Sequence, residues 1–234
     1  MSSAVRENGV IVAIDGPSGA GKSSLTKLLA RRLGYIHIDT GAMFRAVALM
    51  AKRAGIATDD DAGLAALCRG LEIAFVRDNG TCRVLANGED VSSEIRNEEI
   101  GLLTSAVSAR KPVREALLAM QRAMGTKGGV ILEGRDIGTV VFPDAEVKFF
   151  LSASAEERGR RRYLELVARG ERATLEETVA KVIQRDRQDE GRKHAPLRQA
   201  EDAIPIDSTA LSIEEVLAVM EHAVRERLAR GEKG

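Results

Sequence analysis

One stretch near the N-terminus has the residue types and spacing of a phosphate-binding loop. Residues 16–23 match G-x-x-x-x-G-K-[ST]. Glycines let the backbone curl so that successive N–H groups face a phosphate, and a helix N-terminus adds a partial positive charge. Lys22 is expected to reach the β- and γ-phosphates of a nucleotide, and the Ser23 hydroxyl to bind Mg²⁺. The predicted ATP-binding residues are Gly16, Pro17, Ser18, Gly19, Ala20, Gly21, Lys22, Ser23 and Ser24.

The context of the motif favours a phosphate loop over a chance glycine-rich turn. An apolar run, Val10–Ile14, comes directly before it, and an amphipathic helix is expected after it through Leu33. Such loops serve motors, switches and kinases alike. No Asn-Lys-x-Asp element occurs, which disfavours a GTPase. Apolar strands end in Leu132-Glu133 and Phe150-Leu151 rather than in Asp, which disfavours a motor ATPase more weakly.

Arginines suited to binding further phosphates are plentiful. The guanidinium group is planar, binds phosphate through two parallel hydrogen bonds and stays charged at any working pH. Taken singly, each of these arginines could equally be a solvated surface residue, and the run at 160–162 could be the wet face of a helix. The candidates are Arg45, Arg114, Arg135, Arg158, Arg161, Arg162, Arg185 and Arg192.

The strands and helices expected around these residues follow an α/β pattern. Helical stretches mostly separate the short β-branched runs, which predicts a parallel sheet with helices on both faces. A hydroxyl cap paired with a carboxylate three residues later marks three helix starts, at Ser154, Thr174 and Ser212. The expected strands are Val10–Ile14, Tyr35–Ile38, Val130–Leu132, Val147–Leu151 and Ala203–Ile206.

Residues 39–129 are far more than one crossover helix requires, so they are expected to hold an inserted subdomain that grips a second substrate. Within them, Glu72–Arg77 and Thr81–Ala86 flank Asp78, Asn79 and Gly80, which predicts a β-hairpin. Asn87-Gly88 predicts a further turn.

Composition and charge argue against several classes of protein. The formal net charge is zero, so no global field draws the chain to nucleic acid or an acidic membrane. The N-terminal apolar run is too short for a signal peptide or a membrane span, which predicts a cytoplasmic protein. Cys68, Cys82 and the scattered histidines lack metal-ligand spacing, and the cysteines are expected to be reduced thiols. No coiled-coil pattern or large apolar strip argues for an oligomer, so a monomer is expected.

Three further segments resemble the bacterial cytidylate kinases. They are Asp39–Arg45, Glu133–Pro143 and Ile206–Thr209. With the phosphate loop and the tract Arg185–Leu197, they span nearly the whole chain in family order. The resemblance implies a nucleoside monophosphate kinase fold, with a five-stranded parallel sheet, a monophosphate-binding insert and an arginine-bearing lid. It implies a single kinase domain over 1–234, with a core at 8–60, 106–153 and 171–234, an insert at 61–105 and a lid at 154–170.

The resemblance also implies roles for individual residues. Arg45, Arg135 and Arg192 match clamps on the acceptor phosphate. Positions that read cytosine are matched by Ser105, Arg114 and Asp136, and Thr40 stands at a further acceptor-side position. Arg185 and Asp189 match positions that hold the sugar hydroxyls, although their one-turn spacing is also that of a routine helical ion pair. The expected catalytic residues are Lys22, Arg135, Arg158, Arg162 and Arg192.

Three positions depart from the family pattern. Thr40 stands where Ser is common but keeps a hydroxyl, and Glu133 stands where an Asp often precedes Gly-Arg-Asp. Phe44 stands where Tyr is common and removes a hydroxyl that could bind substrate.

The implied activity is transfer of the γ-phosphoryl group of ATP to CMP or dCMP, with Mg²⁺, giving ADP and CDP or dCDP. The acceptor phosphate is already largely deprotonated at neutral pH, so no general base is required. Rival readings are a kinase for UMP, AMP or shikimate, and a regulator that senses a nucleotide without phosphoryl transfer. The ratio of CMP to dCMP use is not fixed by the sequence.

Overall fold

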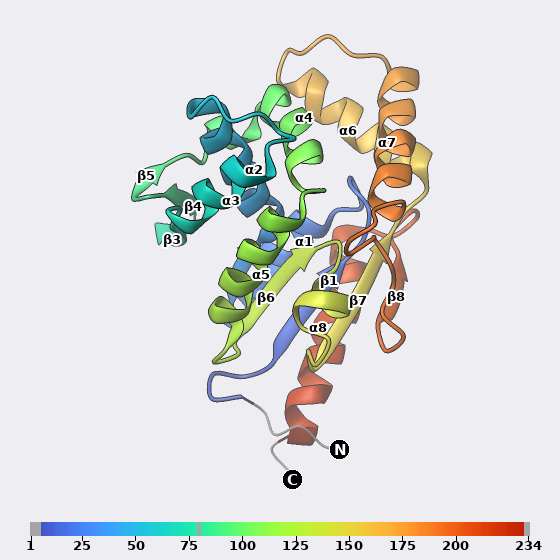
Figure 1. Cartoon of the computed structure of the whole chain (residues 1–234). Coiled ribbons are helices and arrows are strands. Elements are labelled where there is room, and N and C mark those ends of the chain that lie inside the picture. The colour runs from blue at the N-terminus through green and yellow to red at the C-terminus, as the bar shows by residue number, and fades with distance from the viewer. Residues whose placement is uncertain (1–5, 79–80, 232–234) are drawn as a thin grey trace. The chain divides into compact units, whose positions relative to one another are not determined.

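A five-stranded sheet in the order β2-β6-β1-β7-β8 organises the larger part of the chain. β1 pairs in parallel with β6 and β7, and β7 pairs in parallel with β8. All five runs expected to be strands form strands, which confirms the α/β class with a parallel sheet flanked by helices (Figure 1). The strands are β1 (Ile11–Asp15), β2 (Ile36–Asp39), β6 (Val130–Gly134), β7 (Val147–Ser152) and β8 (Ile204–Asp207).

The computed structural model describes residues 6–78 and 81–231. The chain divides into two compact units, here called the first unit (residues 1–37 and 125–234) and the second unit (residues 38–124). The residues 61–105 expected for the insert lie inside the second unit, and those expected for the lid lie inside the first.

The central strands are buried along their whole length, which explains their continuous apolar runs. Every residue of β1 and β6 is buried, as expected for strands covered on both faces. Their register pairs Ile14 with Glu133 and Asp15 with Gly134. The carboxyl ends of these strands therefore bring Asp15, the phosphate loop and the Gly134 turn to one edge of the sheet.

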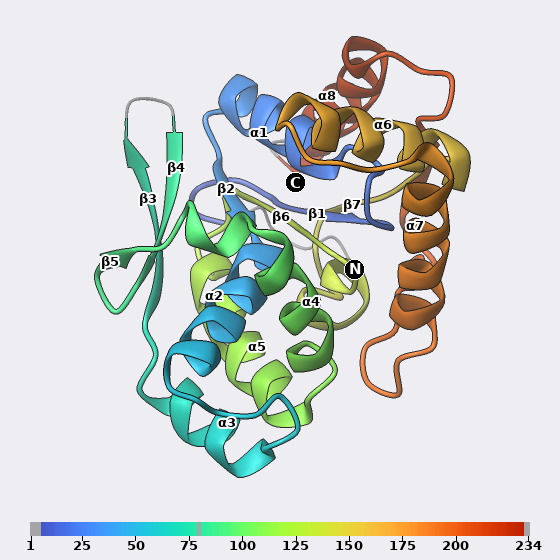
Figure 2. The same cartoon turned by 90° about the horizontal axis from the view of Figure 1, so that it is seen from above.

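Within the described residues, the α-helices of the first unit are α1 (Lys22–Leu33), α6 (Ala155–Ala168), α7 (Leu175–Glu190) and α8 (Ile213–Gly231). The helices α1 and α8 lie side by side on the same face of the sheet (Figure 2), and α6 packs along α7. The core between the sheet and helices α1 and α8 includes Val12, Leu29, Phe149 and Leu217. A short π-helix, η2 (Ile137–Val141), follows the end of β6.

The predicted helix caps are confirmed. Ser154 and Thr174 accept hydrogen bonds from the N–H groups of Glu157 and Glu177, and start α6 and α7. Ser212 forms the complete reciprocal box, because Glu215 also accepts from its backbone N–H at 2.8 Å. The starts of these helices are thus encoded locally.

The second unit has its own apolar core, which includes Met43, Leu64, Ile100 and Leu117. The antiparallel pairing of β3 with β4 confirms the strands of the predicted hairpin, while its tip at Asn79 and Gly80 lies outside the described residues. The turn at Asn87-Gly88 is confirmed, with positive φ at both residues. The elements are α2 (Thr40–Arg53), α3 (Asp61–Arg69), β3 (Ile73–Asp78), β4 (Thr81–Ala86), β5 (Glu89–Asp90), the 3-10 helix η1 (Glu94–Arg96), α4 (Glu98–Val107) and α5 (Lys111–Gly125).

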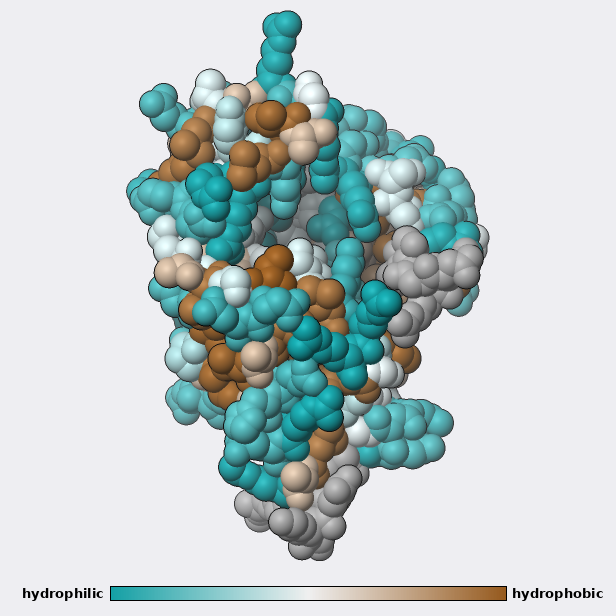
Figure 3. All heavy atoms as spheres, turned by 180° about the vertical axis from the view of Figure 1, so that it is seen from behind, coloured by the Kyte–Doolittle hydropathy of each residue, from teal (hydrophilic) through white to brown (hydrophobic). Residues whose placement is uncertain are grey.

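Large apolar side chains exposed at the surface come from several different elements, and include Ile36, Leu102, Leu164 and Ile213. On the face seen in Figure 3, apolar areas lie among hydrophilic side chains. Among the residues that the structure describes, no helix combines the length and apolar content needed to cross a membrane.

Candidate active site

The phosphate loop runs from the end of β1 into α1, and its glycines are required by geometry. Gly16 has φ 149°, and a Cβ there would lie 1.9 Å from the carbonyl oxygen of Leu151. Gly19 and Gly21 have φ of 79° and 91°, the left-handed region that favours glycine. Helix α1 has no acidic residue in its first turn and Gly21 as its N-cap. No side chain caps its N-terminal N–H groups and its own first turn supplies no carboxylate, which suits a phosphate.

Lys22 lies inside this loop rather than in solvent. It is 6% exposed, and its Nζ donates to the carbonyl oxygens of Gly16 at 2.7 Å and Pro17 at 2.6 Å. Burial and then the positive charge of Arg135 lower the pKa of Lys22 below its ordinary value, while Glu133 and Asp15 act in the opposite direction. The ammonium group is therefore held at the loop among charges of both signs.

Ser23 makes a contact that its sequence position does not reveal. Its Oγ donates to Oε2 of Glu133 at 2.7 Å, and the other oxygen of Glu133 lies 2.8 Å from Nε2 of His37. Glu133 is 3% exposed. A hydroxyl beside a buried carboxylate offers oxygen ligands of the kind that Mg²⁺ prefers, so these residues fit the cation that the motif implies. Within residues 6–78 and 81–231, no cluster of three or more His, Cys, Asp or Glu side chains could hold a metal.

Asp15 connects the end of β1 to the turn after β6. Its carboxylate accepts from the backbone N–H groups of Ile137 at 2.8 Å and Gly138 at 2.7 Å. Burial raises the pKa of Asp15 to about 6, against the opposing effect of these two hydrogen bonds. Asp136, predicted to read cytosine, is 7% exposed and directly precedes η2. Asp15 therefore fixes the backbone on which Arg135 and Asp136 stand.

Two of the predicted phosphate clamps meet at one carboxylate. Asp189 lies 2.7 Å from Nε of Arg135 and 2.5 Å from Nη2 of Arg192, and it is 1% exposed. Burial alone would raise the pKa of Asp189, but the charges of Arg135 and Arg192 hold it below its ordinary value. Arg185, half-buried one turn before Asp189, adds to this effect through its charge. Arg135, Arg192 and Asp189 are thus brought together.

The arginines of α6 have different surroundings. Arg158 is 5% exposed; its guanidinium binds Asp186 at 2.6 and 3.0 Å and the carbonyl oxygen of Ser18 at 3.1 Å. Arg162 pairs with Glu165 at 3.0 Å near the surface. Arg161 donates to the carbonyl oxygen of Ser208 at 2.7 Å. Arg158 therefore braces the phosphate loop, whereas Arg162 points to a partner on its own helix.

A Cβ built on Gly21 would lie 3.8 Å from Nη1 of Arg161, so Arg161 reaches the start of α1. From the sequence, Arg158 and Arg162 were expected to be catalytic, whereas Arg161 was a candidate for phosphate binding without a specific role. All three lie on one helical face at positions i, i+3 and i+4, so periodicity could not distinguish them.

Acceptor-side residues of the second unit also have defined partners. Arg45 pairs with Asp39 at 2.7 Å, and Asp39 caps α2 through the N–H of Ala42. The guanidinium of Arg114 lies 5.4 Å from the ring centre of Phe44, a cation–π contact. Phe44 thus keeps the aromatic face that a Tyr would offer there.

Two other acceptor-side residues lie on helices of this unit. Thr40 is buried at the start of α2. Ser105 is half-buried on α4 and accepts from the hydroxyl of Ser108 at 3.1 Å through its carbonyl oxygen.

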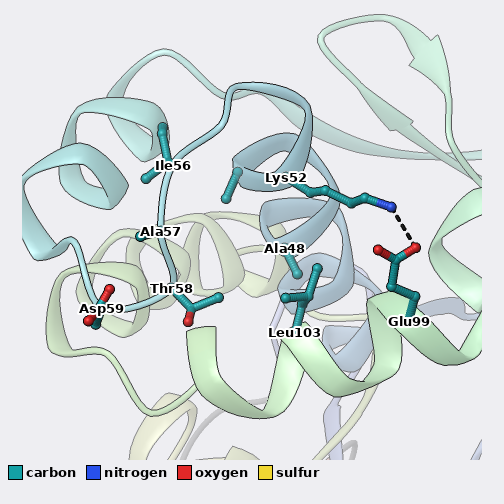
Figure 4. Close-up of a pocket in the computed structure, with 9 residues that line it drawn as sticks. Ala48, Lys52, Ile56, Ala57, Thr58, Asp59, Glu99 and Leu103 are labelled. Carbon is teal, nitrogen blue, oxygen red and sulfur yellow. Dashed lines mark hydrogen bonds and ion pairs between the residues drawn. The ribbon is translucent and has the colours of Figure 1, made fainter.

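A cavity of about 530 Å³ lies in the second unit, and Figure 4 shows Lys52 and Glu99 at one side of it, paired at 2.5 Å. None of the predicted site residues lines it. Its lining residues are Ala48, Ala51, Lys52, Ile56, Ala57, Thr58, Asp59, Glu99 and Leu103.

The loop, its lysine and its place at the carboxyl edge of a parallel sheet define a P-loop nucleotide-binding protein. The family model described as cytidylate kinase matches residues 12–226. A cytidylate kinase of Citrifermentans bemidjiense is 85% identical over 99% of this chain and 100% of its own length. Another, of Geobacter sulfurreducens, is 72% identical over 96% of this chain and 97% of its own length.

The chain therefore belongs to the cytidylate kinase family, and it is an enzyme of the P-loop kinase class. A solved structure of an uncharacterized protein from Eubacterium ventriosum is 11% identical, covers 92% of this chain and 98% of its own, and has a TM-score of 0.50. That likeness concerns the fold alone.

Proposed function

We propose that this chain transfers the γ-phosphoryl group of ATP to CMP or dCMP, giving ADP and CDP or dCDP, and that the residues of the preceding site carry out the transfer. The observation that carries the proposal is the buried Lys22 inside a phosphate loop, in a chain that matches the cytidylate kinase family over residues 12–226. The roles of the individual residues are predictions that the geometry supports.

The chemistry requires alignment and charge neutralisation rather than a base. The acceptor is a phosphate whose second pKa is about 6, so its attacking oxygen is already largely deprotonated at neutral pH. Catalysis of such a transfer depends on positioning and on positive charge around the transferring group. A site built from Lys22 and arginines suits this requirement.

On the donor side, the loop N–H groups and Lys22 would hold the β- and γ-phosphates. In this proposal Nζ of Lys22 exchanges its two carbonyl partners for phosphate oxygens, whose charge favours the ammonium form. Ser23 would hold Mg²⁺, which neutralises charge on the transferring group. Arg158 would keep the loop in shape through Ser18, and Arg162 stays a predicted lid arginine.

On the acceptor side, Arg135 and Arg192 would grip the monophosphate. The carboxylate of Asp189 already occupies both guanidinium groups, which holds them close together before an anion arrives. Preorganised charges of this kind cost no rearrangement during reaction. The roles of Thr40, Arg45, Ser105, Arg114, Asp136 and Arg185 stay predictions of the family resemblance.

The insert at 61–105 and the lid at 154–170 are proposed as the segments that enclose the substrates and deny water access to the γ-phosphate. Action as a monomer, in the cytoplasm and without nucleic acid, also stays a prediction from the sequence.

An acceptor panel tests the proposal. Purified chain is incubated with Mg-ATP and, separately, CMP, dCMP, UMP, AMP or shikimate, and ADP formation is measured. We expect CMP and dCMP to give the highest kcat/KM. Faster turnover of AMP or shikimate would assign another kinase activity to the chain. Tight ATP binding with no product from any acceptor would instead indicate a nucleotide sensor.

A further inference from the structure

The buried contact between His37 and Glu133 has no assigned role in the reaction. We propose that His37 is a positioning residue, which holds Glu133 in the one orientation that directs the Ser23 hydroxyl toward the cation of Mg-ATP. The inference rests on the proposed function, because that function supplies Mg-ATP as the donor.

The three side chains form one continuous chain of hydrogen bonds. Ser23 Oγ donates to Oε2 of Glu133 at 2.7 Å, and Oε1 of Glu133 lies 2.8 Å from Nε2 of His37. The contacts join the start of α1, strand β2 and the end of β6: Ser23 and Glu133 are 110 residues apart in the sequence, and His37 and Glu133 are 96 apart. Each oxygen of the carboxylate therefore has a different partner from a different element.

The chemistry of these groups fixes the direction of both bonds. An ionised carboxylate only accepts, so Nε2 of His37 carries the hydrogen and donates it. The Ser23 hydroxyl likewise gives its single proton to Glu133. Its lone pairs are then left for a cation, and the neighbouring negative charge makes the oxygen a better ligand.

Burial indicates that the histidine is not a packing residue. Its side chain is 9% exposed, and its second nitrogen, Nδ1, is buried without a hydrogen-bond partner among the residues that the structure describes. An unpaired buried polar atom is unfavourable, and a leucine would fill similar space without one. The Nε2–H bond to Glu133 is thus the polar function that the imidazole serves here.

The orientation of the Glu133 side chain matters because its carboxylate also interacts with Lys22. Its charge acts on the buried Lys22, whose ammonium group must remain available for phosphate. The glutamate side chain also has several rotatable bonds, so without a second partner its carboxylate could adopt more orientations. A fixed donor at Oε1 keeps the carboxylate on Ser23 and away from Lys22.

Nucleotide binding with and without metal tests the inference directly. Calorimetry would measure the Kd of ATP in excess Mg²⁺ and in excess EDTA for wild type, His37→Leu and His37→Gln. We expect His37→Leu to weaken Mg-ATP binding by roughly tenfold, the scale seen when outer-shell partners of a metal site are removed, and to leave metal-free ATP binding unchanged. His37→Gln should restore most of the loss, because its amide N–H can still donate to Glu133.

His222→Leu is the matched control, since that histidine is exposed on α8. It should behave as wild type in every assay. Glu133→Gln should also weaken Mg-ATP binding, and adding His37→Leu to it should cause no further loss, because His37 acts through Glu133. In turnover assays, His37→Leu should raise the Mg²⁺ concentration needed for half-maximal rate without changing the KM for CMP.

Equal effects of His37→Leu on ATP with and without Mg²⁺, or no effect on either, would overturn the inference. So would losses that add in the double variant. Circular dichroism and thermal melting establish that each variant is folded before binding is compared. If wild type binds Mg-ATP but phosphorylates no acceptor, the proposed function fails, while the binding comparison still decides the role of His37.

Discussion

Each charged side chain buried near the phosphate loop has hydrogen-bond or ion-pair partners. Burying an isolated charge is costly, whereas a charge with matched partners can be accommodated. Asp15 accepts two backbone N–H groups, Asp189 lies between two arginines, and Lys22 donates to two carbonyl oxygens. Changing any one of these groups removes a hydrogen-bond or ion-pair partner from the groups around it.

Lys22→Ala should lower kcat by about 100-fold or more, because it removes one preorganised positive charge beside the transferring phosphoryl group. Steady-state kinetics with Mg-ATP and CMP measure this effect. Lys27→Ala is the control, since Lys27 is an exposed lysine on the same helix. Near-normal turnover in a folded Lys22→Ala variant would contradict the role assigned to the lysine.

Asp15 should make stability depend on pH. Its pKa is raised from 3.8 to about 6, so between these values the folded chain holds a proton that the unfolded chain has released. The free energy of unfolding therefore falls as pH rises through this range, by up to about 3 kcal/mol from this group.

Asp15→Asn cannot titrate, so wild type should gain stability relative to this variant as pH is lowered from about 7 to about 4. Urea denaturation of both proteins at the two pH values measures the difference. A difference that stays constant with pH would show that Asp15 keeps an ordinary pKa.

At the scale of elements, the close approach of α6 and α7 determines where the α6 arginines lie. A Cβ on Gly159 would lie 2.3 Å from Cγ2 and 2.9 Å from Cα of Val179, so only glycine fits between the two helices. The same α6 carries Arg158, which is bound to Asp186 of α7 and to Ser18 of the phosphate loop. Packing between these helices thus reaches the nucleotide site.

Gly159→Ala should destabilise the protein by roughly 1–3 kcal/mol, because the added methyl group overpacks a tight contact. It should also weaken ATP binding, since α6 cannot keep Arg158 on Ser18 if it moves away from α7. Chemical denaturation and ATP titration measure the two effects. Gly101→Ala is the control: Gly101 lies in α4 with open space around it, and the substitution should be neutral or stabilising.

At the scale of the whole molecule, each unit has its own buried apolar cluster. Unfolding therefore need not be a single transition, and a ligand bound to one unit should stabilise that unit first. The phosphate loop lies wholly in the first unit.

Mg-ATP at about 100 times its Kd should add about 2.7 kcal/mol to the stability of the first unit. Hydrogen exchange should show the added protection in the core strands and α1, and less of it in the second unit. Lys22→Ala should reduce the effect at the same ATP concentration. Uniform protection of both units by ATP alone would contradict this prediction.

Features whose signals lie within a few residues could be predicted from the amino-acid sequence alone. They include the phosphate loop, the five strands, the capped starts of α6, α7 and α8, and the two strands of the β3–β4 hairpin. These features depend on local backbone preferences, on side-chain-to-backbone bonds three residues apart and on runs of apolar residues. Such patterns can be read without knowing what packs against them.

Which side chains meet became visible only in the folded chain. The fold pairs Ser23 and His37 with Glu133, places Asp189 between Arg135 and Arg192, and sets Arg161 beside Gly21. In the sequence, His37 was one of several scattered histidines, and Glu133 was a departure from the family pattern. The physical reason is that most of these partners are distant in the sequence: Glu133 lies 110 residues from Ser23 and 96 from His37, and Arg135 lies 54 from Asp189. They are joined by the register of parallel strands and the packing of helices, which no local spacing records.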